Sequence, residues 1–449
     1  MGKQAYLTMS ATILLFVAMP AGPFSQTAEV PAKDYEAISL LGAKLVPPPA
    51  DEAALSRLTE ARQAFERDPG EDNTIWLGRR LAYAGRYREA IRVFTDGLAR
   101  FPRSYRLLRH RGHRFITIRQ FQRAAEDFDK AAEFVRGRPL EVEPDGIPNK
   151  AGKPVSNTQF NIFYHLGLTR FLSGDYNRAA EAYRECLKWS KNDDSVVAVT
   201  DWLFLTLKRL GRAGDAVRAL TPIKPRMTII ENEAYHQRLL MYKGLVKPED
   251  LLRPQPGQSE AVLRSNSAVR EYGLGNRRLW EGDKRGAMDT FQTLVREGNW
   301  AAFGTIAAEA DLARLLLENP HRATVEETLA SWTAFWNAYD LSAAEKLFLT
   351  DDRPSYFSSE KKGLIRGFNA LLEHHKGFGF VPGGKAQDNR LWLEDVYIQA
   401  FGPTANVAAR WLFDKNVGTE GPVQHGPVTF QLIKGDDGWR IAHAHFANW

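Results

Sequence analysis

The sequence predicts two folded parts, an all-α solenoid of stacked helix pairs followed by an α+β domain. The first observation is that two successive 34-residue units between residues 71 and 138 match position by position. Their matching positions are Gly78, Ala90 and Phe94 in one unit and Gly112, Ala124 and Phe128 in the other. Such a unit cannot bury its apolar face alone and must stack on neighbours. The second observation is that the apolar period changes to two near residue 391, which is typical of strands.

The 34-residue spacing resembles the tetratricopeptide repeat, a helix–turn–helix unit with small residues where its two helices touch. A half-repeat begins at Asp51, two full repeats follow it, and further units resume near Leu166, Leu203 and Leu274. We therefore expect an α-solenoid over residues 51–318. An insertion at residues 137–158 interrupts it, and its four prolines and three glycines indicate turns and loops.

The N-terminus has the pattern of a secretory signal peptide, which we assign to residues 1–26. Lys3 supplies the positive start, residues 5–19 are largely apolar, and Pro20 ends the run. An uncleaved membrane anchor is the alternative, but the apolar run is shorter than the roughly 20 residues that span a bilayer. We expect a linker at residues 27–50, a periplasmic or secreted protein, and no stable membrane span after cleavage.

The last part, residues 323–449, begins with amphipathic helices and continues with strands expected at residues 391–400, 405–414, 428–434 and 439–446. This order, with "WNAYDLSAAEKLFLTDD" early and "GDDGWRIAHAHF" last, resembles the SnoaL-like and ketosteroid-isomerase-like superfamily. The resemblance implies a curved antiparallel sheet wrapped on helices, which form a cone with a pocket.

The pocket residues depend on which face of the last strand lines the cone. Trp439, Ile441, His443 and His445 alternate onto one face, with Arg440 on the other. If the histidine face lines the pocket, the candidate binding residues are Trp332, Trp336, Tyr339, Tyr356, His374, Trp411, His443 and His445.

The isomerase chemistry of this superfamily is not expected here. Its hydroxyl donor and carboxylate base would fall on Trp332 and about Phe357, and neither side chain can do that work. We therefore assign no catalytic residue, although a different reaction with Asp352 or His443 as base stays open. The His-x-His pair at His443 and His445 lacks a third ligand for a metal ion, so we expect neither metal nor cofactor.

Arginines are concentrated in the first two repeats. Between Arg79 and Arg123 there are thirteen arginines against two acidic residues, a charge of +11 in a chain of net charge +6. Guanidinium groups suit carboxylates and phosphates because each presents a planar fork of donors. By resemblance to the repeat family, the concave groove for a partner is predicted to contain Arg79, Arg106, Arg109, His113, Asn161 and Tyr164.

Two other interpretations of the arginines stay open. They could pair locally on a solvated surface, or the insertion could fold back over them with Glu141, Glu143 and Asp145. Nucleic acid is not expected as a partner, because aromatic stacking residues are not interleaved and the chain is predicted to be exported.

We therefore predict an exported adaptor that presents a basic concave surface to a protein or peptide with acidic groups. Its C-terminal domain is expected to bind a small molecule or to form a homodimer. The alternative is an enzyme of dehydratase, cyclase or isomerase type with its active site in the cone. The single cysteine, Cys186, is expected to be a buried structural thiol.

Overall fold

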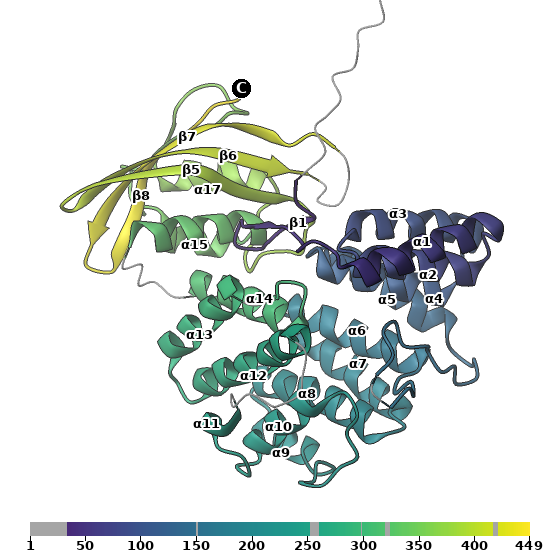
Figure 1. Cartoon of the computed structure of the whole chain (residues 1–449). Coiled ribbons are helices and arrows are strands. Elements are labelled where there is room, and N and C mark those ends of the chain that lie inside the picture. Colours follow the sequence, from purple (N-terminus) through teal and green to yellow (C-terminus); the bar gives the residue numbers. More distant parts are fainter. Residues whose placement is uncertain (1–33, 150, 252–259, 298, 319–323, 416–420) are drawn as a thin grey trace, which may run out of the picture. The chain divides into compact units, whose positions relative to one another are not determined.

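The structure is a computed structural model that describes residues 34–149, 151–251, 260–297, 299–318, 324–415 and 421–449. The predicted signal peptide lies outside the described residues. The described chain begins with a short β-hairpin, continues with helices up to residue 318, and ends with helices and a six-stranded sheet (Figure 1). Among all the residues that the structure describes, no helix is both long and apolar enough to span a bilayer.

The helical part is a tetratricopeptide-type solenoid of helix pairs. Helix α1 (Glu52–Arg67) precedes the pairs and α14 (Phe303–Glu318) follows them. The pairs are α2 (Glu71–Tyr83) with α3 (Tyr87–Arg100), α4 (Tyr105–Thr117) with α5 (Phe121–Phe134), α6 (Thr158–Leu172) with α7 (Tyr176–Trp189), α8 (Asp193–Arg209) with α9 (Ala213–Ala219), α10 (Glu233–Tyr242) with α11 (Pro248–Leu251), and α12 (Glu260–Trp280) with α13 (Lys284–Glu297).

The repeated glycines explain why the pairs form. A methyl group added at Gly78 would lie 2.3 Å from the ring of Phe94, and one at Gly167 would lie 2.5 Å from the ring of Tyr183. Each glycine therefore lets an aromatic ring of the second helix lie directly on the first helix. The fourth pair has Phe204 instead, and this ring stacks on Tyr242 of α10. The second helix of that pair, α9, is only 7 residues long.

The C-terminal part is an α+β domain with a six-stranded sheet. Its helices are α15 (Val325–Ala338), the 3₁₀ turn η1 (Leu341–Ala343), α16 (Ala344–Leu347) and α17 (Phe368–Gly377). Its strands are β3 (Ser355–Phe357), β4 (Ile365–Arg366), β5 (Arg390–Phe401), β6 (Thr404–Asp414), β7 (Gln424–Gly435) and β8 (Gly438–Phe446). The four strands expected from the sequence are confirmed as β5 to β8.

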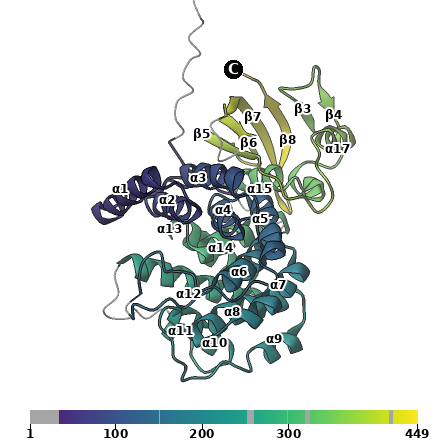
Figure 2. The ribbon, with the colours of Figure 1, turned by 90° about the vertical axis from the view of Figure 1, so that its right-hand side faces the viewer.

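The sheet has the order β4-β3-β8-β7-β6-β5. Figure 2 shows β3, β4 and α17 at one end of it. All neighbours are antiparallel except β3 and β8, which are parallel, so the sheet is mixed rather than wholly antiparallel as expected. The fully buried ring of Trp332 on α15 packs on Phe430 and Phe446 and forms the centre of this domain's core.

The described residues of the expected linker are folded. Strands β1 (Ala37–Ile38) and β2 (Lys44–Leu45) form a hairpin, and we call residues 34–50 the strap. Tyr35 packs edge-on against Trp392 of the sheet. The amide of Leu40 donates to Glu309 of α14 at 2.7 Å. The strap therefore contacts both the sheet domain and the solenoid.

Candidate functional site

The predicted groove residues lie on the first helices of three successive pairs. Arg79 belongs to α2, Arg106, Arg109 and His113 to α4, and Asn161 and Tyr164 to α6. The guanidinium groups of Arg79, Arg80, Arg106 and Arg109 all contact the insertion, and we call these four residues the arginine face.

The insertion lies on the arginine face through residues 141–146, which we call the acidic segment. Nε of Arg106 lies 3.1 Å from Glu141 and Nη2 of Arg109 lies 2.9 Å from Glu143. Arg79 and Arg80 donate to the carbonyl oxygens of Pro144 and Gly146, at 2.9 and 2.8 Å. Of the interpretations left open by the sequence, the structure therefore shows the one in which the insertion folds back over the arginines.

The backbone of the acidic segment is held by the chain that follows it. The backbone amide of Glu143 donates to the carbonyl oxygen of Ser156 at 3.2 Å, and the backbone amide of Thr158 donates to the carbonyl oxygen of Glu141 at 2.8 Å. Val142 and Asn157 form an antiparallel bridge. The segment is thus paired along one edge, while its carboxylates and carbonyls meet the arginines.

The pair of Arg109 and Glu143 differs from the pair of Arg106 and Glu141 in its burial. Arg109 and Glu143 are each 8% exposed. Burial lowers the pKa of Arg109, and the carboxylate of Glu143 opposes that shift. Because a buried guanidinium without an anion is costly, Arg109 requires a carboxylate at this position. The half-exposed Arg106 pair contributes less to stability.

The side chains of the remaining predicted groove residues are covered by other parts of the protein. Asn161 still faces the insertion, since its amide donates to Ser156 Oγ at 3.0 Å. The ring of His113 lies against His165 and against Phe303 of α14, at centroid distances of 4.6 and 5.2 Å.

Tyr164 is also a core residue. Its hydroxyl accepts a hydrogen bond from Trp202 at 2.8 Å and lies 3.2 Å from the hydroxyl of Tyr235. Tyr164 is therefore corrected from a groove residue to a residue of the solenoid interior, whereas His113 is partly buried against α14. The reason for His113 is that α14 returns to the inner side of the early repeats, which the local repeat pattern cannot reveal.

The second candidate site is a cavity of about 320 Å³ in the C-terminal domain. Four of the eight predicted pocket residues line it, namely Trp336, Tyr339, Tyr356 and Trp411. Its other lining residues are Phe378, Leu391, Phe413 and Phe446, with Ser358, Ser359, Glu360, Asn389, Lys415 and Gln424 as polar members. Trp332 lies beneath the lining, and His374 packs behind Tyr356 at a centroid distance of 5.3 Å.

His443 and His445 do not line this cavity, so that prediction is wrong. In the pairing of β7 with β8, Leu432 faces Ile441 and Gln431 faces His443, which leaves Ala442 as an extra residue. This bulge reverses the alternation, because one inserted residue moves all later side chains to the opposite face. Ala444 and Phe446 therefore point into the core, while His443 lies beside Ser355 at 2.8 Å.

Two tyrosines that line the cavity have raised pKa values. Burial raises the pKa of Tyr356, and it also raises that of Tyr339, whose hydroxyl accepts a hydrogen bond from Asn389 at 3.0 Å. The candidate base Asp352 is exposed and is not among the lining residues. Among the described residues that line the cavity, the one carboxylate is Glu360, which is exposed. No group of three His, Cys, Asp or Glu in the described chain could hold a metal ion.

Two further predictions concern Cys186 and the sheet surface. Cys186 is buried, as expected, and its thiol donates to the carbonyl of Phe160 at 3.4 Å. Burial raises the pKa of this thiol, which keeps it protonated and unreactive.

The outer face of the sheet exposes Tyr397 and His445. The homodimer through this domain stays a prediction.

Comparison with known proteins gives matches only among solved structures. No family model matches the sequence, and no curated protein matches it. An NTF2-like superfamily protein from Salmonella enterica serovar Typhimurium is 18% identical over 28% of this chain and 93% of its own, with a TM-score of 0.22. The S. rosetta CaMKII hub is 22% identical over 28% of this chain and 94% of its own, with a TM-score of 0.23.

For the helical part, the MamA AMB-1 structure is 15% identical over 38% of this chain and 87% of its own, with a TM-score of 0.29. TM-scores this low carry no argument about function. The fold assignment therefore rests on the helix pairs and the sheet described above.

Proposed function

We propose that this protein is an exported adaptor whose arginine face binds an extended acidic segment of a partner protein. The observation that supports this most strongly is the position of its own acidic segment, whose two glutamates pair with Arg106 and Arg109. The predicted signal peptide supports export. The partner's segment would take the place of residues 141–146.

The spacing of the contacts defines what such a segment needs. Glu141 and Glu143 are two residues apart, so on an extended chain their side chains point the same way, about 6.6 Å apart. Arg106 and Arg109 are three residues apart on α4 and therefore share one face of that helix. A partner with two acidic residues in an E-x-E pattern, followed by carbonyls for Arg79 and Arg80, meets all four arginines.

The test uses a variant that lacks residues 138–156. After this deletion, Asn157, the N-cap of α6, is the fourth residue after the end of α5. This is the spacing of the regular junction before it, where Ser104, the N-cap of α4, is the fourth residue after the end of α3. The deletion therefore restores the regular repeat spacing and uncovers the arginine face. We expect a labelled synthetic peptide of residues 138–156 to bind the deletion variant in fluorescence anisotropy.

Charge reversal then tests the arginines themselves. In the deletion variant, Arg106→Glu with Arg109→Glu should weaken peptide binding by at least a hundredfold while the circular dichroism spectrum is retained. Arg178→Glu with Arg184→Glu, on the exposed side of α7, is the control with the same change in charge and should leave binding unchanged. Equal loss in both variants, or no binding by the deletion variant, would refute recognition by the arginine face.

We also propose that the C-terminal cavity binds a small, mainly apolar and aromatic ligand. Its lining of Trp336, Tyr339, Tyr356, Trp411 and Phe446 supports this, because ligand pockets are mostly apolar with few polar groups. The enzyme alternative has less support, since neither of its candidate bases is among the described residues that line the cavity.

The cavity can be tested with the amphipathic aromatic probe 8-anilinonaphthalene-1-sulfonate. Ser359 lines the cavity and is partly exposed, so Ser359→Trp should fill the space without removing a core contact. We expect at least tenfold weaker probe binding by fluorescence titration in this variant. His443→Ala, which changes the opposite face of the sheet, should bind the probe like the unchanged protein. Unchanged binding by Ser359→Trp would place the probe elsewhere.

A further inference from the structure

One arginine beyond the arginine face has no anion beside it. Arg114 lies on α4 and is partly exposed, and its guanidinium contacts the ring of Tyr87 at 5.9 Å from the ring centroid. Among the residues that the structure describes, no carboxylate pairs with this guanidinium and no oxygen accepts a hydrogen bond from it. None of its nitrogens is both buried and unbonded, so these nitrogens reach solvent.

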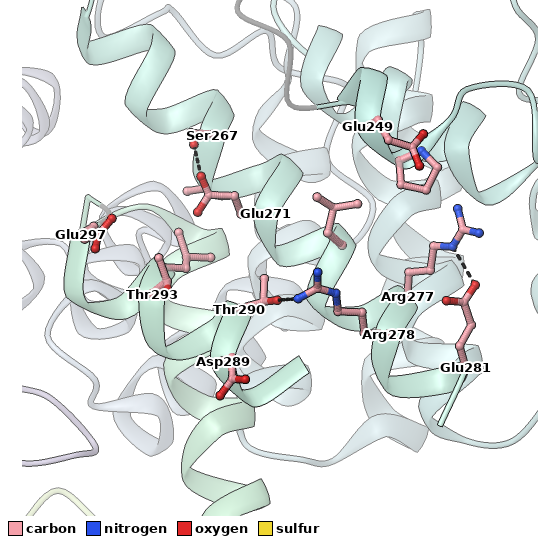
Figure 3. A pocket seen from close by; sticks show the side chains of 14 residues that line it. Glu249, Ser267, Glu271, Arg277, Arg278, Glu281, Asp289, Thr290, Thr293 and Glu297 are labelled. Atoms are coloured by element: carbon pink, nitrogen blue, oxygen red, sulfur yellow. Dashed lines mark hydrogen bonds and ion pairs between the residues drawn. The ribbon is translucent and has the colours of Figure 1, made fainter. Parts of the chain in front are cut away.

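Arginines elsewhere on the solenoid surface are held in local contacts. In the pocket of about 890 Å³ beside α12 and α13, Arg277 pairs with Glu281 and Arg278 donates to Thr290, each at 2.7 Å (Figure 3). The positive groups of that pocket are therefore already engaged with the protein. Arg114 differs from them, because its charge is left for a group from outside.

The surroundings of Arg114 favour the binding of an anion. Burial lowers the pKa of Arg114 to about 10, and the nearby charges of Arg109 and Arg79 act in the same direction. A carboxylate placed on Arg114 would offset the repulsion among these guanidinium groups and would accept charge-assisted hydrogen bonds.

Arg114 continues the line of contacts between α4 and the acidic segment, which runs in the same direction as this helix. The ring of His110 lies 4.0 Å from Glu143, and Arg114 follows His110 by four residues, so both side chains lie on the same side of α4. Four residues of a helix advance about 6 Å, and two residues of an extended chain advance about 6.6 Å. A carboxylate two residues after the position of Glu143 therefore reaches the level of Arg114.

The protein's own acidic segment does not make this third contact. The residue two positions after Glu143 is Asp145, but its carboxylate accepts a hydrogen bond from Asn149 at 3.2 Å. Asn149 also donates to Glu231, before α10, at 2.7 Å. After Glu143 the segment thus leaves α4, and its next contacts are with α2 and with Glu231.

We propose that Arg114 is a third subsite of the arginine face, which binds an acidic residue two positions after the second glutamate of the partner's segment. This inference rests on the proposed function of the arginine face and specifies the partner further, as an extended segment with the pattern E-x-E-x-E. Alternate side chains of an extended chain point the same way, so the three carboxylates meet Arg106, Arg109 and Arg114. The third contact gives the partner an advantage over the insertion, which does not make it.

The test compares two labelled peptides of identical composition and charge. The first has the sequence of residues 138–146 with Pro144→Val and Asp145→Glu, so its glutamates stand at alternate positions. The second has Pro144→Glu and Asp145→Val, which turns the third glutamate to the opposite face of the extended chain. In fluorescence anisotropy with the full-length protein, we expect the first peptide to bind at least tenfold more tightly than the second.

Variants of the protein then locate the difference. Arg114→Gln removes the charge and keeps a polar side chain, and it should make the two peptides bind equally. Arg178→Gln, exposed on α7, is the control with the same change in charge and should keep the tenfold preference.

Two results would overturn the third subsite. One is equal affinity of the two peptides for the unchanged protein, including no binding of either, and the other is a preference that persists in Arg114→Gln. Failure of the peptide of residues 138–156 to bind the deletion variant would instead refute the arginine face as a whole, so the two failures are distinguishable.

Discussion

Replacing Glu309 with alanine is expected to destabilise the protein by about 3–5 kcal/mol, because the change leaves a buried guanidinium without its anion. Arg119 is fully buried and Glu309 is 1% exposed. Two nitrogens of Arg119 bond to this carboxylate, one of them at 2.8 Å. The carboxylate of Glu309 also accepts a hydrogen bond from the backbone amide of Leu40, so the alanine variant removes this contact of the strap as well.

The effect can be measured as the shift in the free energy of unfolding by urea. Glu373→Ala removes an exposed pair with Lys376 and should cost less than about 1 kcal/mol. Arg119→Met with Glu309→Leu should recover much of the loss, since an apolar pair leaves no unpaired charge. A cost for Glu309→Ala as small as that for Glu373→Ala would show that the pair does not hold α14 to the early repeats.

Stability is expected to fall steeply as the pH drops below about 6.5, because several buried histidines are neutral in the folded protein. Burial lowers the pKa of His375 to about 4, and burial with nearby arginines lowers the pKa of His110 and His165 well below 6.5. The unfolded chain binds protons that the folded chain does not, so acid favours unfolding. Each such histidine contributes about 1.4 kcal/mol per pH unit below 6.5.

One of these histidines can be isolated by substitution. His375 lies among Phe335, Trp336 and Phe380, so His375→Phe is a conservative change in this setting. Between pH 6.5 and 4.5, we expect the variant to lose stability less steeply than the unchanged protein, by about 1.4 kcal/mol per pH unit. His425→Gln, at an exposed position, is the control and should keep the original slope. An unchanged slope in His375→Phe would mean that His375 is not held neutral.

The repeat architecture was predictable because its signal is local. A glycine at a fixed distance from an aromatic ring, as in Gly78 with Phe94, specifies a helix pair within one 34-residue unit. The acidic residues that follow the arginines also indicated that the insertion could cover them. The contact of the His113 ring with Phe303 was not predictable, because Phe303 lies 190 residues further along the chain.

The C-terminal site was predicted in part for a similar reason. Helical spacing placed Trp336 near the cavity, and the strand pattern placed Trp411 there. The error at His443 arose from the bulge at Ala442, which reverses the alternation after Ile441. The consecutive apolar residues Ile441 and Ala442 were the mark of this bulge in the sequence, and the prediction instead assumed an uninterrupted alternation. The strap had no periodicity to detect, since its two strands have 2 residues each and their contacts are distant in sequence.

The strongest test of the adaptor compares peptide binding by the intact protein and by the deletion variant. The tethered acidic segment competes at a high effective concentration, so the free peptide of residues 138–156 should bind the intact protein at least tenfold more weakly than the variant. Equal affinities of the two proteins would contradict the proposal, because they would show that the peptide binds away from the arginine face.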